Sequence, residues 1–297
     1  MTTNTKCVLA IGNFDGVHQG HAALLKTAGD IAADNQLPLY VLTFEPHPRT
    51  FFKPDTTPFR ITLRNTKIRL LKAFASDVRV LDFNAFLAGM SAQQFINDII
   101  VRDMNAAHVV VGQDFHFGKD RSGHIETLQA DTRFKTTPIP LIGDTMAAIS
   151  STRIRQALHD GNITEVNEML GWHWAIEGEV IHGDKRGREI GFPTANIPLG
   201  DTLCPAHGIY AVWVDIGDGK WLPGAANIGL RPMFALAKPL LEVYLLDWSG
   251  DLYGKTLKVR PVKHLRPEAK FEGLEALKAQ IAKDCAAARD VLISLAP

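Results

Sequence analysis

The sequence predicts two domains of different class: an α/β domain with a parallel sheet over residues 1–171, and a mainly β domain with a C-terminal helix over 172–297. Short apolar runs alternate with helical patterns before Gly171, which is typical of a parallel sheet covered by helices. After Gly171 the apolar runs are separated by tight turns instead. A chain of 297 residues that is 46% hydrophobic is long enough to bury two cores.

The first domain begins with a buried strand and continues with strands and helices in alternation. Apolar runs predict strands over 7–11, 39–44, 78–83 and 109–112. Thr62 and Ser91 precede helical patterns and are candidate N-caps. Gly171 follows a predicted helix over 163–170, which it is expected to end.

The second domain is predicted to be a small β-barrel or sandwich. Strand patterns cover 208–216 and 240–248, and the alternation of apolar and charged residues over 257–260 adds a half-buried strand. Apolar residues then recur at helical spacing over 274–292, so we expect a helix at the end of the chain.

Composition and charge limit the classes of function that this chain can have. Lys plus Arg and Asp plus Glu each number 32, so no overall field attracts nucleic acid or an anionic membrane. The three cysteines are odd in number and far apart, which favours a structural role for each. No apolar run approaches the roughly 18 residues of a membrane span. We expect a cytoplasmic protein, monomeric or weakly oligomeric, with no nucleic acid and no membrane as partner.

Residues 12–21 join the first strand to a helical pattern through glycines and two histidines. Unpaired backbone N–H groups and the positive end of the helix dipole favour an anion there. His18 and His21 are three residues apart, so both imidazoles face one side of the helix start. The segment predicts a phosphate site, with a metal pair or two surface histidines as the alternatives.

Two further segments are candidates for binding the same nucleotide. Residues 112–123 follow a strand and mix glycines with cations, and residues 149–155 place hydroxyls before a helix. Arg155 can bind a phosphate bidentately. Segments 12–21, 44–48 and 112–123 follow strands, and ligands of parallel sheets bind at the carboxyl ends of the strands. The alternatives are a mobile loop at 112–123 and an ordinary helix cap before Arg155.

Residues 183–196 are too rich in glycine and cations for a plain strand connection. Glycines let a backbone close on an anion, which predicts a second phosphate loop, with a charged surface loop as the alternative. If 194–197 are extended, Thr194 and Asn196 share one face and offer Mg²⁺ the oxygen ligands it prefers. Glu242 interrupts an apolar strand, so its carboxylate either faces solvent or is held as a general base.

These motifs resemble those of a known family. Segments 12–21 and 149–155 are similar to the paired signatures of nucleotidyltransferases. With 44–48 and 112–123, they resemble the adenylyltransferase module of prokaryotic bifunctional riboflavin kinase and FAD synthetase. Segments that resemble the flavokinase signature lie at 224–232, 239–246, 251–254 and 265–271. The resemblance implies a Rossmann-like nucleotidyltransferase domain followed by a small β-barrel flavokinase domain.

For the first domain, the resemblance implies that the FMN phosphate attacks the α-phosphorus of ATP, giving FAD and pyrophosphate. The residues implied in catalysis are His18, His21 and Arg155. The residues implied to bind ATP are Gly12, Phe14, Asp15, Gly20, Ser151 and Thr152. The residues implied to bind flavin are Asp114, Phe115 and Arg121. Asp114 is otherwise a turn residue, and Phe44, Phe59 and Phe115 either line a flavin or adenine pocket or belong to the core.

For the second domain, the resemblance implies phosphorylation of riboflavin to FMN by ATP. Glu242 would activate the ribityl 5′-hydroxyl, and Thr194 and Asn196 would bind Mg²⁺. The implied phosphate ligands are Gly183, Lys185, Gly187 and Arg188, and the implied flavin ligands are Arg266 and Phe271. Met233 stands where such kinases usually carry Thr, so this chain lacks the threonine hydroxyl at that position.

Two other functions fit part of the sequence. An aminoacyl-tRNA synthetase shares the histidine and Ser-Thr signatures, but the neutral charge and the lack of a basic RNA-binding stretch oppose it. A flavin-binding protein without turnover has no need for phosphate, metal and base residues together. The sequence therefore favours the bifunctional enzyme, whose partners are riboflavin, FMN, FAD and ATP and whose cofactor is Mg²⁺.

Overall fold

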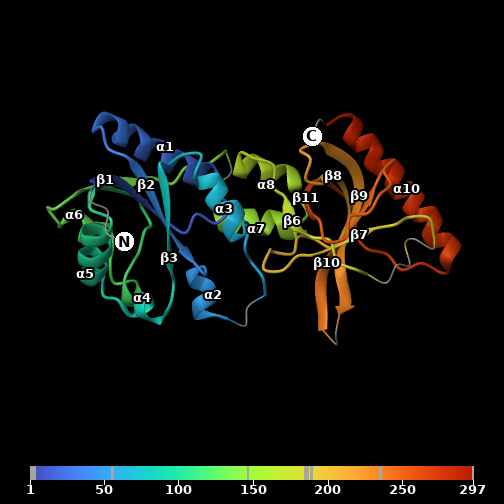
Figure 1. The fold of residues 1–297 in the computed structure, drawn as a ribbon, viewed down its shortest axis with the longest axis horizontal. Coiled ribbons are helices and arrows are strands. Elements are labelled where there is room, and N and C mark those ends of the chain that lie inside the picture. The colour runs from blue at the N-terminus through green and yellow to red at the C-terminus, as the bar shows by residue number, and fades with distance from the viewer. Residues whose placement is uncertain are drawn as a thin grey trace. The chain divides into compact units, whose positions relative to one another are not determined.

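The computed structural model describes residues 5–54, 57–145, 147–183, 187, 190–233 and 236–295. The chain packs as two compact units, Met1–Thr57 with Thr62–Ser151 and Pro58–Ile61 with Thr152–Pro297 (Figure 1). This division places residues 152–171 with the second unit, whereas the sequence predicts a domain boundary at 171. The boundary between the two functional domains stays a prediction.

The first unit is built on a parallel sheet with the strand order β3-β2-β1-β4-β5. Its strands are β1 (Cys7–Ile11), β2 (Leu39–Glu45), β3 (Asp77–Asp82), β4 (Ala106–Gly112) and β5 (Lys135–Ile139). The four strands expected from apolar runs are therefore confirmed. Strand β5 was not expected, because most of its residues are polar and it carries Pro138, which is tolerated at the edge of the sheet.

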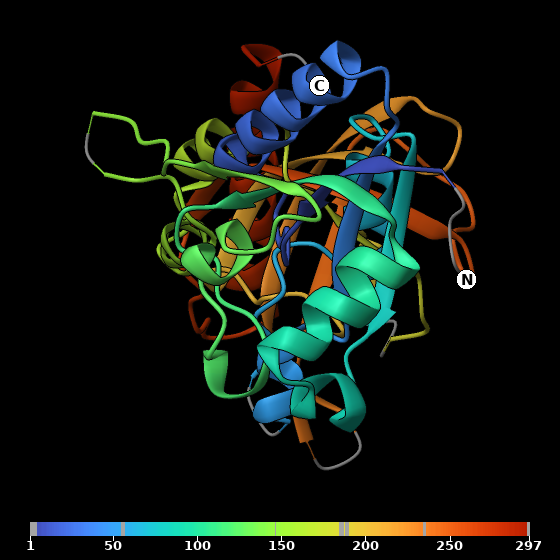
Figure 2. The same cartoon turned by 90° about the vertical axis from the view of Figure 1, so that its left-hand side faces the viewer.

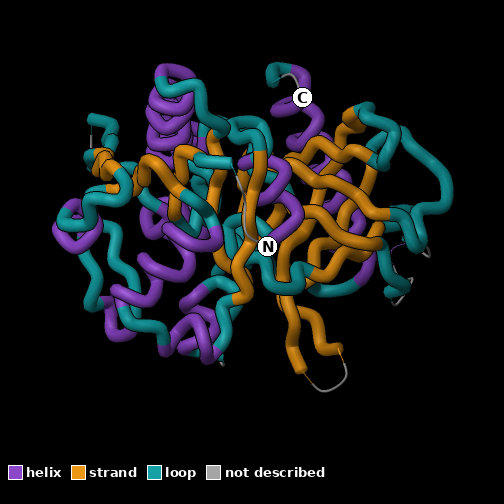
Figure 3. Tube along the Cα trace, turned by 60° about the vertical axis from the view of Figure 1, so that its left-hand side comes forward, coloured by secondary structure: helices purple, strands orange, loops and turns teal. Residues whose placement is uncertain are grey.

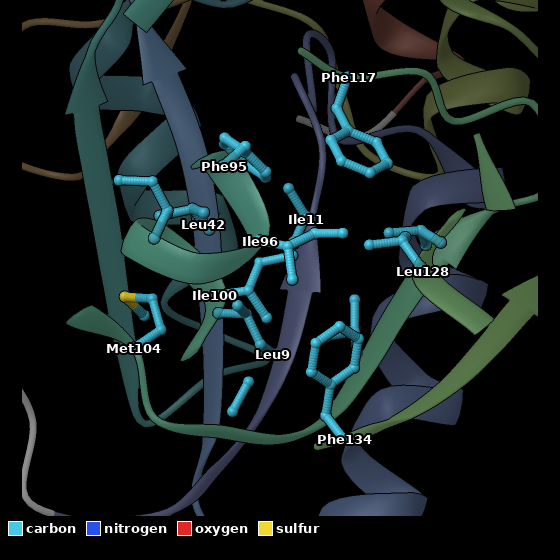
Figure 4. Packing of buried hydrophobic residues seen from close by; sticks show 14 of the residues in the cluster. Leu9, Ile11, Leu42, Phe95, Ile96, Ile100, Met104, Phe117, Leu128 and Phe134 are labelled. Atoms are coloured by element: carbon cyan, nitrogen blue, oxygen red, sulfur yellow. The ribbon is translucent and has the colours of Figure 1, made fainter. Parts of the chain in front are cut away.

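Helical segments cover both faces of this sheet (Figure 2). The helical segments of this unit are α1 (Gln19–Asp34), α2 (Pro48–Phe52), α3 (Arg64–Leu71), α4 (Ala85–Gly89), α5 (Ala92–Gln94), the π-helix η1 (Phe95–Asp103), the 3-10 turn η2 (Lys119–Arg121) and α6 (Ile125–Gln129). Of these, α1 and α3 pack on one face, and α4, η1 and α6 pack on the other. Successive β1 side chains alternate between the faces. Val8 and Ala10 pack with α1, whereas Leu9 and Ile11 pack with η1 and α6 (Figure 4).

Two of the three helix caps expected from the sequence are present in the structure, and one is not. Ser91 forms a capping box with Gln94, and Gly171 ends α8 (Ile163–Leu170) in the left-handed conformation, at φ 74°. Both caps are confirmed. Thr62 is not a cap: α3 has Leu63 at its N-cap position, without a side-chain hydrogen bond. The Thr62 hydroxyl lies in a buried hydrogen-bond network with Asp15 and Gly16 instead.

The second unit is an antiparallel barrel rather than a sandwich. Its elements are α7 (Ser151–His159), α8, β6 (Ile176–Glu179), β7 (Ala195–Pro198), β8 (Gly208–Asp215), β9 (Trp221–Met233), β10 (Leu236–Leu245), β11 (Thr256–Arg266) and α10 (Leu274–Ile293). The strand order is β6-β11-β8-β9-β10-β7, and Figure 3 draws the strands in orange. An isolated bridge between Ile181, just after β6, and Asn196 of β7 links the two ends of this order, so the barrel is nearly closed. The expected C-terminal helix packs Ala288 and Leu292 on Ala211 and Ala225.

All three cysteines are free thiols. Burial raises the pKa of the Cys7 thiol to about 12 and those of Cys204 and Cys285 to about 11, so all three stay protonated at neutral pH. Within the described ranges, no helix has both the length and the apolar character needed to cross a lipid bilayer.

Candidate active sites

The loop after β1 lies at the point where the order of the first sheet reverses, between β1 and β4. Ligands of open parallel sheets bind at such a switch point. The loop backbone is strained: φ is 50° at Phe14 and 40° at Val17, values that L-residues rarely adopt and that are least suited to a β-branched side chain. Strain of this kind gathers at functional sites, where surrounding contacts hold it in place.

Thr62 and Asp15 hold the strained loop. The Asp15 carboxylate, in a residue only 2% exposed, accepts hydrogen bonds from the Thr62 backbone N–H at 3.0 Å and from the Thr62 hydroxyl at 3.2 Å. The same hydroxyl accepts from the Gly16 N–H at 3.0 Å. Asp15, predicted to bind phosphate, therefore directs its carboxylate at Thr62 and shapes the turn.

His18 and His21 lie together at the start of α1, as expected. His18 is the N-cap residue, and its Nδ1 accepts from the backbone N–H of His21 at 3.3 Å. The two rings stack with their centroids 3.6 Å apart. Burial, the neighbouring His18 and the cationic Lys67 all hold the pKa of His21 well below its usual 6.5. His21 is therefore a neutral imidazole at pH 7, and its buried Nδ1 has no hydrogen-bond partner among the described groups.

The two glycines of this motif leave room for aromatic rings. A Cβ on Gly12 would lie 3.0 Å from the ring of Phe14, and a Cβ on Gly20 would lie 3.1 Å from the ring of His18. Both distances are shorter than ordinary carbon contacts. The structure thus shows a packing role for Gly12, Phe14 and Gly20. Their predicted role in phosphate binding stays a prediction.

Lys67 is a residue of this site that the sequence analysis missed. Its side chain is fully buried, and Nζ lies 2.7 Å from Glu45 Oε1. The ammonium also donates to the carbonyls of Phe44 at 3.1 Å and Asn13 at 3.3 Å. A buried cation thus ties the end of β2 to the loop after β1. The sequence does hold one indication of this role. Lys67 lies four residues before the buried Leu71, on the same face of its helix, and a lysine on a buried face needs a partner.

The segment at the start of α7 reaches the same loop through its serine. The Ser151 hydroxyl donates to the backbone carbonyl of Asp15 at 2.8 Å. Thr152 and Arg155 pack with the second unit, where Arg155 Nε donates to the Phe59 carbonyl at 2.9 Å and the guanidinium lies over the Phe59 ring. Phe59 is 7% exposed and serves there as a packing partner.

The loop after β4 carries the predicted flavin residues of the first domain. Asp114 and Arg121 are exposed, and Phe115 stacks on the buried Phe117 at 5.6 Å between ring centroids. Gly123 closes this loop by backbone hydrogen bonds with Phe117 in both directions.

A cluster of phenylalanines lies at the carboxyl ends of β2 and β3. The ring of Phe83 makes edge contacts with Phe44, Phe51 and Phe52 at 5.5 to 6.0 Å. Phe44 is 8% exposed and belongs to the core, whereas Phe52 is 64% exposed. Exposed aromatic faces at this edge suit a planar ring system.

In the second unit, a row of polar residues crosses three barrel strands. Asn196 of β7, Glu242 of β10 and Asn227 of β9 occupy directly opposed register positions, so their side chains share one face. Asn227 Nδ2 donates to Glu242 Oε2 at 3.3 Å. The expected proximity of Asn196 and Glu242, which are far apart in the sequence, is therefore present in the fold.

Two of the predicted loop glycines lie against the predicted metal ligands. A Cβ on Gly183 would lie 2.6 Å from Asn196 Nδ2, and a Cβ on Gly187 would lie 3.5 Å from the Thr194 hydroxyl. The Gly187 carbonyl accepts from the Phe192 N–H at 2.8 Å, which closes a short turn. Lys185 and Arg188 lie outside the described residues, and so does the side chain of Met233.

Arg266 makes an ion pair within the second unit. Its guanidinium donates to both carboxylate oxygens of Asp284 in α10, at 2.8 and 2.6 Å, and to the Pro267 carbonyl at 2.9 Å. The guanidinium also lies 5.7 Å from the Phe271 ring centroid. Arg266 therefore anchors the C-terminal helix, and the flavin-binding role of Arg266 and Phe271 stays a prediction.

The fold and the two polar sites define a two-domain transferase with one site on a parallel sheet and another in a barrel. The FAD synthetase family model matches residues 1–153, and the riboflavin kinase family model matches residues 170–292. The chain belongs to the family of bifunctional riboflavin kinases/FMN adenylyltransferases.

Relatives and a solved structure match along nearly the full chain. The bifunctional riboflavin kinase/FMN adenylyltransferase of Escherichia coli K12 is 44% identical, covering 96% of this chain and 92% of its own. The Bacillus subtilis protein of the same name is 39% identical, covering 94% and 90%. A crystal structure of a macrolide-efflux protein from Streptococcus pneumoniae is 34% identical, with a TM-score of 0.88 and coverage of 98% and 96%.

Proposed function

We propose that this chain makes FAD from riboflavin in two steps that each consume ATP. Residues 172–297 form the riboflavin kinase domain, which yields FMN, and residues 1–171 form the FMN adenylyltransferase domain, which yields FAD and pyrophosphate. The order of the two matched family models supports this assignment. The observation that carries it is that each unit holds its own polar site, the stacked histidines in one and the row of Asn196, Glu242 and Asn227 in the other.

In the adenylyltransferase domain, FMN supplies the nucleophile, so the protein needs none. A phosphate oxygen of FMN bonds to the α-phosphorus of ATP, and the bond from that phosphorus to the bridging oxygen breaks to release pyrophosphate. Catalysis then consists of positioning and charge stabilisation. A neutral His21 has one N–H to donate to the phosphates, and the Nε2–H of His18, whose Nδ1 is an acceptor, is a second donor. By the family resemblance, Ser151, Thr152 and Arg155 are further candidate phosphate ligands.

In the kinase domain, Glu242 is the general base. Its carboxylate takes the proton of the ribityl 5′-hydroxyl as the oxygen bonds to the γ-phosphorus of ATP, and ADP leaves. Thr194 and Asn196 would hold Mg²⁺, and the fit is supported by their neutral side-chain oxygens, which are ligands that Mg²⁺ accepts, and by the register pairing of Asn196 with Glu242. When bound, Mg²⁺ neutralises charge on the phosphates. Gly183, Lys185, Gly187 and Arg188 would cover them.

Flavin recognition is assigned to aromatic and charged side chains in both domains. In the first, the exposed Phe52 and the loop residues Asp114, Phe115 and Arg121 offer ring contacts and hydrogen bonds. In the second, Phe271 offers a ring beside Arg266. We place the enzyme in the cytoplasm as a monomer or weak oligomer. With a net charge of zero it has no overall field that attracts nucleic acid or an anionic membrane, so we propose that it acts without either.

The test is incubation of the full chain with riboflavin, ATP and Mg²⁺, followed by chromatography of the flavins. The proposal expects FMN and then FAD, with ADP and pyrophosphate as the coupled products. Absence of both flavin products would overturn it. Pyrophosphate exchange that depends on an amino acid, with no flavin product, would support the aminoacyl-tRNA synthetase alternative instead.

A further inference from the structure

Asn227 lies between two carboxylates in the barrel. Its Nδ2 donates to Glu242 Oε2 and to Glu268 Oε1, each at 3.3 Å. An amide nitrogen carries two protons, so one nitrogen can serve both carboxylates at once. Asn227 and Glu268 lie in segments 224–232 and 265–271, which resemble the flavokinase signature, and the resemblance implies no role for either residue.

The two carboxylates determine which atom of the Asn227 amide, the nitrogen or the oxygen, faces them. With the opposite orientation, the amide oxygen would face two carboxylates, which offer it no proton when ionised. In the orientation observed, the buried Oδ1 has no hydrogen-bond partner among the described groups. The two carboxylates therefore determine the orientation, and the amide in turn restrains both of them.

The backbone is built to admit Glu268 at this place. The Glu268 carboxylate lies directly over Gly229, where a Cβ would collide with Glu268 Oε1 and lie 2.8 Å from its carboxyl carbon. A Cβ at this position, two residues after Asn227 on strand β9, would displace the Glu268 carboxylate from where it is observed. The strand thus carries the amide and the gap that lets Glu268 reach it.

We propose that Asn227 is a positioning residue of the kinase site, which aims the Glu242 carboxylate at the substrate hydroxyl and is itself held by Glu268. This rests on the proposed role of Glu242 as general base. A base must lie within hydrogen-bond reach of the proton it removes, and hydrogen bonds at such sites are often long before substrate binds. A glutamate side chain is flexible, so a fixed hydrogen-bond donor is needed to hold its carboxylate in one orientation.

The test compares single-turnover FMN formation, at saturating riboflavin and Mg·ATP, in the full chain and four variants. These are Asn227→Ala, Glu242→Gln, the double variant and the control Asn167→Ala. The Asn167 side chain likewise makes a hydrogen bond within the second unit, where it accepts from the Trp174 N–H, but Asn167 lies in α8. Riboflavin affinity is measured by quenching of flavin fluorescence, and FAD formation from FMN reports on the other domain.

We expect Asn227→Ala to slow phosphoryl transfer by about 10- to 100-fold, the range for a misplaced catalytic group, with riboflavin affinity and FAD formation unchanged. In the Glu242→Gln background the same substitution should add no further loss, because groups that act as a unit are not additive. Asn167→Ala should keep the normal rate.

Four results would overturn the proposal in distinguishable ways. A slow Glu242→Gln variant beside a normal Asn227→Ala variant, or losses that multiply in the double variant, would remove Asn227 from the role while Glu242 keeps its own. A Glu242→Gln variant with the normal rate would overturn the base assignment and the positioning role together. Loss of riboflavin affinity in Asn227→Ala, with the rate at saturation preserved, would identify it as a binding residue instead.

Discussion

His18 and His21 stack face to face, with their ring planes 19° apart, and His18 also accepts the backbone N–H of His21. Two imidazolium rings in this arrangement would repel each other, so the pair favours at most one charge. Lys67, buried behind the loop, adds a positive charge that disfavours protonation of His21 further. The site therefore presents a neutral imidazole donor beside the buried Lys67–Glu45 ion pair, and positioned donors of this kind suit the developing charge of an adenylyl transfer.

Replacing His21 with Ala should slow FAD formation from FMN by at least about tenfold, the scale for loss of one positioned donor. Riboflavin phosphorylation should be unaffected, because it belongs to the other domain. Both half-reactions are measured by flavin chromatography, with the exposed His159→Ala as control. A normal rate of FAD formation would remove His21 from the site.

Stability of the first unit should depend on pH through His21. Its folded pKa lies below the unfolded value of 6.5, so the unfolded chain binds a proton first as the pH falls. Stability from this group is therefore present above pH 6.5 and is lost as the pH falls towards the folded pKa. The Tm should drop more between pH 7.5 and 5.5 in the parent chain than in His21→Gln, and equal drops would contradict this account.

Lys67→Met should destabilise the first unit by about 3–5 kcal/mol, because it leaves the Glu45 carboxylate largely buried without its partner. Denaturant unfolding measures the change, and the exposed Lys72→Met serves as control. Adding Glu45→Gln should recover part of the loss, since the unpaired charge is then gone. A double variant less stable than Lys67→Met would show that the ion pair is not the cause.

Thr62→Val should loosen the strained loop that carries the histidines. It removes the hydroxyl that donates to Asp15 and leaves the Gly16 N–H without that acceptor, a loss of about 1–3 kcal/mol. FAD formation should fall and FMN formation should not. Thr136→Val is the matched control, because the buried Thr136 hydroxyl has no described partner to lose. Equal effects of both substitutions on FAD formation would contradict the bracing role of Thr62.

Sequence patterns predicted the architecture well because both domains follow strong periodicities. The runs at 7–11 and 39–44 became adjacent parallel strands, and the C-terminal helix spans Leu274–Ile293 as expected. What the sequence could not show was pairing across the fold. Thr62 is of a residue type that often caps helices, and only its contact with Asp15 shows that it braces the loop after β1 instead.

The same limit applies to the sites. Asn196 and Glu242 were candidates by residue type, but their opposed register depends on strands far apart in the chain. Lys67 and Asn227 were missed because each depends on partners remote in sequence, Glu45 and Phe44 for one and Glu242 and Glu268 for the other. A buried polar side chain can be assigned a role only when its partners are known.

The central claim is that the two reactions occupy separate sites in one chain. The most direct measurement is the rate of each half-reaction in the full-length Glu242→Ala variant, riboflavin to FMN and FMN to FAD. We predict that FMN formation is abolished, while FAD formation from added FMN stays within about twofold of the parent rate, as expected for an independent site. Equal loss of both reactions would contradict the account.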